Sequence, residues 1–343
     1  MHRRRWRIKI LSISFAAIAV FLTIIVFIHA NNIKKTLENI NFNQKNGNNA
    51  FSEVVFKMYN EKGKEIHLKS DKISEDEKDH FTFHNISLSF AMPNGENGTV
   101  TANTVKAFRA DKTICEFSNN VIFKTDSGLT IKTEKSYVDF ERKLASGSSN
   151  ITLTRGNAKA SSKKYLFDMG KNILTLIDEA KGCFKTDKVA SNKIVICFSN
   201  EHSNSVKNLE AIGNASYVSL SYNLQARQSI LYQVDSIEAS DHVILLYKSN
   251  AHDYDIRSNR LHATLDKDGK ISKVIATGSL IIKTNNATIC ADKGVFLNDK
   301  INVYGNVIIS GEQGDILGNS AVLDMRTGEV SVDNSCGIIN ERK

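Results

Sequence analysis

The feature of this sequence that most constrains its fold is a repeated unit of short strand-like segments. Its plainest copy spans residues 289–310, ICADKGVFLNDKINVYGNVIIS. The copy predicts a strand that reaches a polar turn at residues 291–293, a second strand, a turn at residues 298–300, and a third strand over residues 301–309. Gly305 and Asn306 interrupt the third strand, and a glycine inside a strand usually marks a bulge or a close backbone approach.

The same interruptions recur along the chain, which indicates a repeat protein. A small residue followed by a polar one occurs roughly every 27 to 35 residues, at Ser70-Asp71, Ala102-Asn103, Thr133-Glu134, near Ser161, and at Ser191-Asn192, Ala226-Arg227, Ser258-Asn259, Ala291-Asp292 and Gly318-Asn319. The accompanying strand recurs as NNVIFKT, SNITLTR, GNASYVS, SDHVILLYK, TGSLIIKT and GNVIIS. About nine units therefore fill the chain from residue 51 onward.

Within these units apolar and polar residues alternate, as in residues 86–90 and 151–154. That period of two is typical of a sheet with one buried face. Turns are expected where Gly, Asn and Asp gather, at residues 92–95, 126–128, 266–269 and 326–328. The pattern predicts an all-β body.

An uncharged apolar stretch precedes that body. Residues 10–28, ILSISFAAIAVFLTIIVFI, are 19 residues long, enough for a helix to cross a hydrocarbon core. A cleaved signal peptide is the alternative, but its apolar region would be shorter and end in a small-residue cleavage site. Five basic residues precede the stretch, so the positive-inside rule predicts a single-pass membrane anchor with a cytoplasmic N-terminus and an exported body.

The formal net charge of +8 does not indicate a nucleic-acid partner. Five of the 45 basic residues precede the apolar stretch, and without them 40 basic residues face 37 acidic ones, a balance of +3. Nucleic-acid binding would require clustered Lys and Arg in the folded part, where the sequence has none.

Nothing in the sequence predicts catalysis, a metal or a cofactor. The five cysteines, Cys115, Cys183, Cys197, Cys290 and Cys336, include no C-x-x-C pair. A bridge between Cys183 and Cys197 is one option in an oxidising compartment, and burial as small apolar residues is the other. His80 and His84 lack an H-E-x-x-H context and are interpreted as solvated turn residues.

Taken together, an N-terminal membrane helix, a polar tether and units ending in G-N-V-x-I resemble the LptC family of lipopolysaccharide transport. The segment MYNEKGKEIHL, residues 58–68, resembles the opening hairpin of that family. Gly63 would then be the counterpart of an important turn glycine, at a position that glycine adopts with little strain. Beyond the usual length of that family, residues 187–335 resemble the soluble LptA/OstA domain.

The resemblance implies an elongated OstA-like β-jelly roll, either continuous or as two tandem parts. Residues 1–30 would form the cytoplasmic basic end and transmembrane helix, residues 31–50 a polar linker, residues 51–186 an LptC-like jelly roll, and residues 187–340 an LptA/OstA-like jelly roll. It also implies a non-enzymatic lipid-transfer component of lipopolysaccharide export, anchored in the inner membrane with its body in the periplasm. This component would bind acyl chains of lipopolysaccharide or a related lipid in an apolar slot and pass them toward the outer membrane. The inward apolar positions are candidates to line that slot, and ordinary core packing is the alternative for each of them: Phe81, Phe83, Ile86, Leu88, Phe90, Val121, Phe123, Ile151, Leu153, Val243, Leu245, Leu280, Ile282, Val307 and Ile309.

The ends of the strand region are expected to dock partners. The chain contains a single proline, Pro93, whereas proline is a common device for protecting sheet edges. Open edges favour strand addition, so partner-binding edges are predicted at Val54, Phe56, Met58, Val330 and Val332. By resemblance the partners are an inner-membrane ABC transporter (LptB2FG-like) and a periplasmic LptA-like or outer-membrane LptD-like jelly roll.

The repeats leave a second function class open. A membrane-anchored β-solenoid scaffold or adhesin that binds protein or glycan along its outer face would show the same repeats. Such a scaffold would not need an apolar slot.

Overall fold

The computed structural model describes residues 50–339, except for 60–64, 77–79, 92–96, 109–113, 127, 129, 140–141, 143, 169–170, 172, 185–186, 199–205, 220–221, 234, 249–252, 267–270, 313 and 334–335. Every regular element in this part of the chain is a β-strand, which confirms the all-β prediction. The predicted membrane segment and residues 31–49 of the predicted linker lie outside the described residues. The described part contains no helix with the length and apolar character needed to span a membrane.

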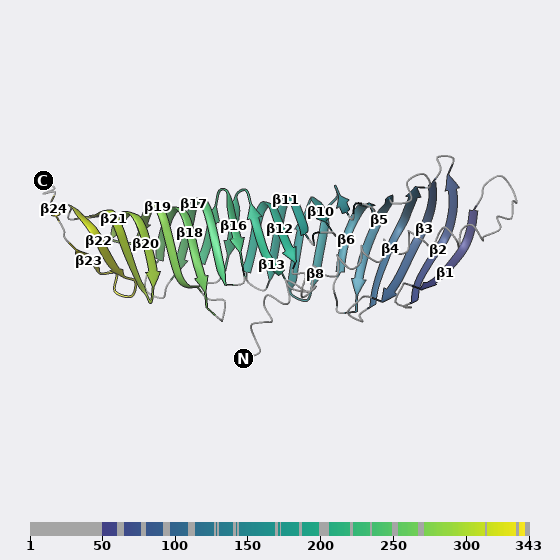
Figure 1. Ribbon diagram of the computed structural model, residues 1–343, viewed down its shortest axis with the longest axis horizontal. Coiled ribbons are helices and arrows are strands. Elements are labelled where there is room, and N and C mark those ends of the chain that lie inside the picture. Colours follow the sequence, from purple (N-terminus) through teal and green to yellow (C-terminus); the bar gives the residue numbers. More distant parts are fainter. Residues whose placement is uncertain are drawn as a thin grey trace. The chain divides into compact units, whose positions relative to one another are not determined.

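The strands, labelled in Figure 1, form two compact units. The N-terminal unit contains the described residues up to Gly182 together with Val195–Val206, and the C-terminal unit contains Cys183–Ile194 and the described residues from Lys207 onward. The division into jelly rolls at residues 51–186 and 187–340 stays a prediction.

The strands of the N-terminal unit are β1 (Ala50–Tyr59), β2 (Glu65–Asp76), β3 (His80–Ala91), β4 (Asn97–Phe108), β5 (Ile114–Thr125), β6 (Thr130–Asp139), β7 (Leu144–Gly147), β8 (Ile151–Arg155), β9 (Ala158–Ser162), β10 (Lys164–Asp168) and most of β11 (Ile173–Phe184). All their ladders are antiparallel, and each long strand divides its pairing between two ladders. Residues 130–133 of β6 pair with β8, whereas residues 137–139 pair with β7. We call the ladder through β7 and β10 half-sheet A and the ladder through β8 and β9 half-sheet B.

The C-terminal unit repeats this plan. Its strands are β13 (Val206–Ile212), β14 (Ala215–Val218), β15 (Tyr222–Ala226), β16 (Ser229–Tyr232), β17 (Ser236–Lys248), β18 (Asp253–Leu265), β19 (Ile271–Lys283), β20 (Ala287–Leu297), β21 (Lys300–Gly311), β22 (Gly314–Asp324), β23 (Val330–Asp333) and β24 (Cys336–Ile339), with the first part of β12 (Asp187–Phe198). Half-sheet C runs from β13 and β16 through residues 236–240 of β17 to β23. Half-sheet D runs from β14 and β15 through residues 243–248 of β17 to β24.

Long strands pass from one half-sheet to the other at a corner, and in β5, β11, β17, β19 and β21 two successive corner residues adopt left-handed backbone angles. In β21 these residues are Gly305 (φ 77°) and Asn306 (φ 46°), and the ladder register shifts between Tyr304 and Val307. Gly and Asn are the residues that adopt this conformation at lowest cost. Equivalent corners lie at Asn119-Asn120, Asp178-Glu179, Gly213-Asn214, Asp241-His242 and Gly278-Ser279.

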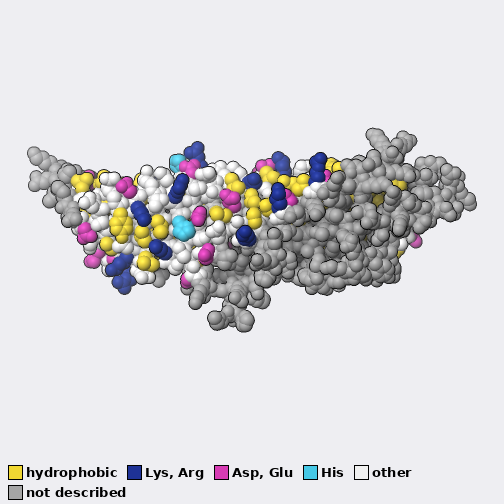
Figure 2. Space-filling view, viewed as in Figure 1, with side chains coloured by type: hydrophobic (Ala, Val, Ile, Leu, Met, Phe, Trp, Pro, Cys, Tyr) yellow, Lys and Arg dark blue, Asp and Glu magenta, His cyan; other side chains and the backbone are white. Residues whose placement is uncertain are grey.

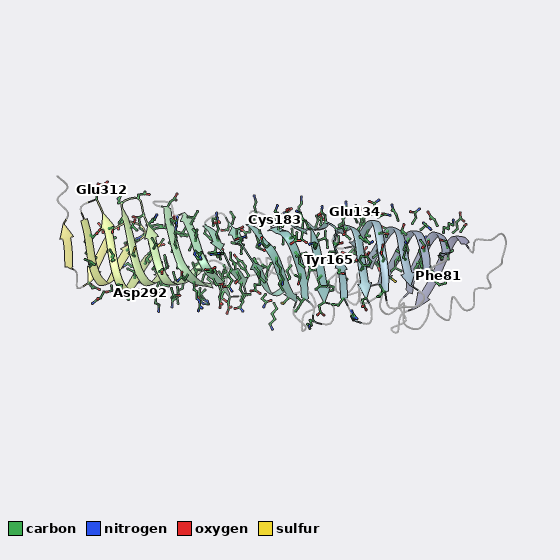
Figure 3. All side chains as sticks on the ribbon, turned by 90° about the horizontal axis from the view of Figure 1, so that it is seen from above. Phe81, Glu134, Tyr165, Cys183, Asp292 and Glu312 are labelled. Atoms are coloured by element: carbon green, nitrogen blue, oxygen red, sulfur yellow. The ribbon has the colours of Figure 1, made fainter. Side chains whose placement is uncertain are left out.

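The small-polar step of the sequence lies against these corners. Asn306 Nδ2 donates to Asp292 Oδ2 at 2.9 Å, and Asn85 Nδ2 makes the equivalent bond to Asp71 at 2.9 Å. Asp292 belongs to β20, so the turn predicted at residues 291–293 is wrong: the strand continues, and the polar residue covers the neighbouring corner (Figure 3). The turn predicted at residues 298–300 is confirmed, because β20 and β21 are joined through Asn298 and Asp299.

Where the small residue of the step is a serine, its hydroxyl bonds the backbone. The Oγ atom donates to the carbonyl two residues later in each of four copies, at 2.8 to 3.0 Å: Ser70 to Lys72, Ser162 to Lys164, Ser191 to Lys193 and Ser258 to Arg260. These serines are buried, and a buried carbonyl without a partner is destabilising. The hydroxyl therefore provides a partner where the strand turns away from its ladder.

Replacing Gly305 with Ala tests the corner geometry. The new Cβ would lie 2.5 Å from Asp292 Oδ2 and 3.1 Å from Asp292 Cβ, in addition to left-handed strain of roughly 1–2 kcal/mol. We expect G305A to lower the free energy of unfolding by more than that strain alone, measured by urea denaturation and circular dichroism. In a double-mutant cycle, D292A should remove the excess and leave only the backbone strain. Additive losses would show that Asp292 and the corner do not interact.

Candidate functional site: the apolar interior

The predicted lining residues of the N-terminal unit lie on inner faces, with Phe81 and Phe83 in half-sheet A and the others in half-sheet B. Seven of them are buried and Phe81 is half-buried, while the side chain of Phe90 lies outside the described residues. The buried residues are Phe83, Ile86, Leu88, Val121, Phe123, Ile151 and Leu153. Burial follows from the period of two, because alternate residues of each strand point to the same face.

Inner residues of neighbouring strands also face one another in register. In half-sheet B an unbroken row crosses five strands, each member paired with the next: Leu88, Val100, Phe123, Ile131 and Leu153. Every member of this row is at most 8% exposed. The row runs perpendicular to the strands, at about 4.8 Å per strand.

The C-terminal unit contains a longer row of the same kind. It crosses half-sheet D through Leu224, Leu245, Ile256, Ile282, Ile289 and Ile309. The predicted residues Val243, Leu280 and Val307 lie beside it, and all three are 1% exposed. Six strands at this spacing give an apolar row of about 24 Å.

The prediction missed the facing wall of the C-terminal unit and, apart from Phe81 and Phe83 on β3, that of the N-terminal unit. Half-sheet C carries its own row, formed by Ile237, Ala263, Val274, Phe296, Ile301 and Leu323. Half-sheet A likewise buries Val105, Phe117, Val138 and Phe167. A usable signal was present: inner positions continue across the corner with a four-residue gap, as from Val303 to Val307.

Near the last strands the two walls of the C-terminal unit are joined by a hydrogen bond. Tyr254 lies in the part of β18 that belongs to half-sheet D. Met325 directly follows the part of β22 that belongs to half-sheet C. The Tyr254 hydroxyl donates to the Met325 carbonyl at 2.9 Å, and both residues are buried. This bond closes the interior at that point.

A second buried tyrosine reinforces half-sheet A. The Tyr165 ring lies over Gly147, where a Cβ atom would collide with it, and its hydroxyl donates to Ser136 Oγ at 2.6 Å (Figure 3). Burial raises the pKa of Tyr165 to about 12. The hydroxyl therefore stays protonated, and its role is structural.

Chemistry other than apolar binding has little support in the described residues. They contain no cluster of His, Cys, Asp and Glu suited to a metal ion.

His80 and His84 lie within β3, so their interpretation as turn residues is wrong. Cys183 is a thiol, so the optional bridge between Cys183 and Cys197 is not formed. The described Lys, Arg, Asp and Glu side chains on the face in Figure 2 are intermixed.

The predicted partner edges lie at terminal strands of their units (Figure 1). Within the described residues the only ladder partner of β1 is β2, and β23 and β24 pair only with β22. Val54, Val330 and Val332 are half-buried. The side chains of Phe56 and Met58, and the whole of Gly63, lie outside the described residues.

Two comparisons with known proteins bear on the site. Residues 16–185 match the family described as "Lipopolysaccharide-assembly, LptC-related". The matched region begins inside the apolar stretch of residues 10–28 and ends just after β11. A comparison with curated proteins finds no match.

The thiol of Cys115 can report whether the interior excludes water. It lies on the inner face of β5 at 5% exposure, and burial raises its pKa from 9.0 to about 12. Because the thiolate is the reactive form, its fraction should fall about a thousandfold. We expect a variant that keeps only Cys115 to react with maleimide at least that much more slowly than one that keeps only Cys290, which is half-buried on an outer face. Equal rates in the folded proteins would show a hydrated interior.

Proposed function

Residues 16–185 belong to the LptC-related lipopolysaccharide-assembly family, and from this premise we propose that the chain is a membrane-anchored periplasmic bridge for lipid. The family assignment confirms the resemblance seen in the sequence and identifies a lipopolysaccharide-transport component. The finer proposal is that acyl chains bind between the half-sheets and pass along them toward the outer membrane.

The observation that carries this proposal is the direction of the apolar rows. In any antiparallel sandwich, strand pairing aligns the inner residues of neighbouring strands. Here the aligned residues are apolar at every strand of the rows in half-sheets B and D. An extended acyl chain lying along such a row would contact an apolar side chain at every strand, and burial of each CH2 contributes about 0.8 kcal/mol.

Membrane anchoring by residues 10–28 completes the proposal. The cluster of Arg3, Arg4, Arg5, Arg7 and Lys9 before the stretch favours a cytoplasmic N-terminus. A body in the periplasm would then begin near β1. The edge of β1 would face the inner-membrane ABC transporter, and the edge formed by β23 and β24 would face an LptA-like or LptD-like jelly roll.

Backbone hydrogen bonding indicates which N–H groups of β23 are available to an added strand. Asp324 N–H donates to the Glu329 carbonyl at 2.9 Å, so this is a hydrogen-bonded pair at the start of β23. Hydrogen-bonded and non-bonded pairs alternate in an antiparallel ladder. The pair of Val322 and Ser331 should therefore be bonded, while the N–H of Val330 points away from β22 and is available to an added strand.

Site-specific photo-crosslinking tests the lipid-binding proposal. A crosslinker at Ile309, which is 6% exposed, should capture lipid in cells because it lies on the inner row. A crosslinker at the adjacent Ile308, which is 37% exposed on the outer face, should capture none. Phe123 and its exposed neighbour Lys124 give the same matched comparison in the N-terminal unit.

The readout is crosslinked lipid identified by mass spectrometry. Equal lipid capture by inner and outer positions, or none at either, would contradict the proposal. Capture of protein or glycan at Ile308 alone would instead favour an outer-face scaffold or adhesin.

Proline substitutions in β23 test the partner edge. V330P removes an N–H directed outward, so lipid delivery to the outer membrane should fall while the protein remains folded and abundant. S331P removes the N–H directed toward β22 and should instead weaken β23 itself, by roughly 1 kcal/mol or more. Delivery is measured in cells, and folding by circular dichroism. Undiminished delivery with V330P would show that this edge does not dock the next jelly roll.

A further inference from the structure

Three tyrosines gather at one end of the apolar rows in the C-terminal unit. Tyr217 and Tyr222 belong to half-sheet D, and Tyr232 belongs to half-sheet C. The ring centroids of Tyr217 and Tyr232 are 4.9 Å apart, and those of Tyr217 and Tyr222 are 5.6 Å apart. Because contacting rings come from opposite walls, the cluster lies in the interior between them.

The cluster is continuous with both rows. Tyr217 pairs with Leu224, the first residue of the row in half-sheet D. Tyr232 pairs with Ile237, the first residue of the row in half-sheet C. Each apolar row therefore begins at a tyrosine, and a chain lying between the rows would have one end at these hydroxyls.

One of the hydroxyls has no partner. The Tyr232 hydroxyl oxygen is buried and makes no hydrogen bond to any described residue. A buried hydroxyl without a partner costs about 1–3 kcal/mol, so native structures rarely retain one without a reason. Burial also raises the pKa of Tyr232 well above its usual value, so the group remains an O–H donor.

The remaining polar groups restrict what this donor can bind. Tyr217 is hydrogen-bonded to Tyr222 and to the Asp187 carboxylate, and burial together with these neighbours raises its pKa. The carboxylate carries a negative charge within the cluster, so a phosphate would be repelled there. A neutral hydrogen-bond acceptor is favoured.

From this geometry we propose that the Tyr232 hydroxyl donates a hydrogen bond to the ester or amide carbonyl of an acyl chain that lies along the two rows. This rests on the proposed function, and it deepens it by assigning a polar end to the site. A carbonyl is the first polar group met at the end of an acyl chain, and it is neutral. It accepts a hydrogen bond without bringing a charge toward Asp187.

Comparing lipids with ester-linked and ether-linked chains tests whether the Tyr232 hydroxyl binds a carbonyl. The probes are a phosphoethanolamine lipid with two ester-linked acyl chains and its dialkyl ether analogue of equal chain length, which lacks the carbonyls. Affinities are measured by displacement of a fluorescent acyl lipid from the full-length protein in detergent. The native protein should bind the ester lipid about fivefold more tightly than the ether lipid, which is the affinity ratio expected from one net hydrogen bond. The variant Y232F, which keeps the ring, should bind both equally.

The controls separate this inference from the proposed function and from a folding defect. Y304F alters an exposed tyrosine on an outer face and should keep the preference. Y232F should melt at the same or a higher temperature, because the substitution removes an unpartnered buried hydroxyl. Lower stability of Y232F would instead indicate a structural role for the hydroxyl.

Two results would overturn the inference. If the native protein shows no preference, or if Y232F keeps it, the hydroxyl does not bind a carbonyl, although the lipid-binding function stands. If the native protein binds neither lipid, the proposed function fails and this inference fails with it.

Discussion

The constraint on which the rest of this structure depends is the corner. Two successive residues adopt left-handed angles, as at Gly305 and Asn306, and the strand leaves one ladder and joins the other. L-residues other than Gly and Asn adopt this conformation at a cost, so the corner must be supported. The support comes from the neighbouring strand, where Asp292 bonds Asn306.

A fold built from such corners places apolar residues on two facing walls at low sequence separation. Each long strand contributes to both walls, and neighbouring strands are close in sequence, so the unit extends by repetition. In-register pairing then aligns equivalent residues into rows, such as the one that includes Ile256, Ile282 and Ile289. The rows are a consequence of strand register, and they provide the direction along which a lipid chain would lie.

Polar groups mark the limits of the apolar interior. Tyr254 joins the walls near the last strands through its bond to the Met325 carbonyl, whereas the tyrosine cluster at the other end retains an unpartnered hydroxyl on Tyr232. The first arrangement is satisfied and structural. The second is unsatisfied within the described residues, and it marks the place where a ligand would supply the missing acceptor.

The sequence by itself determined the all-β class, the repeat, the corner at Gly305-Asn306 and the inward positions from Phe83 to Ile309, because alternation and Gly-Asn pairs are local signals. It also pointed to the LptC family. Only the tertiary structure decided that residues 291–293 continue a strand, that the inner positions on the two sides of a corner form facing walls, and that Tyr217 and Tyr232 meet across the interior. These depend on ladder register and on contacts between half-sheets, which no local pattern of residues encodes.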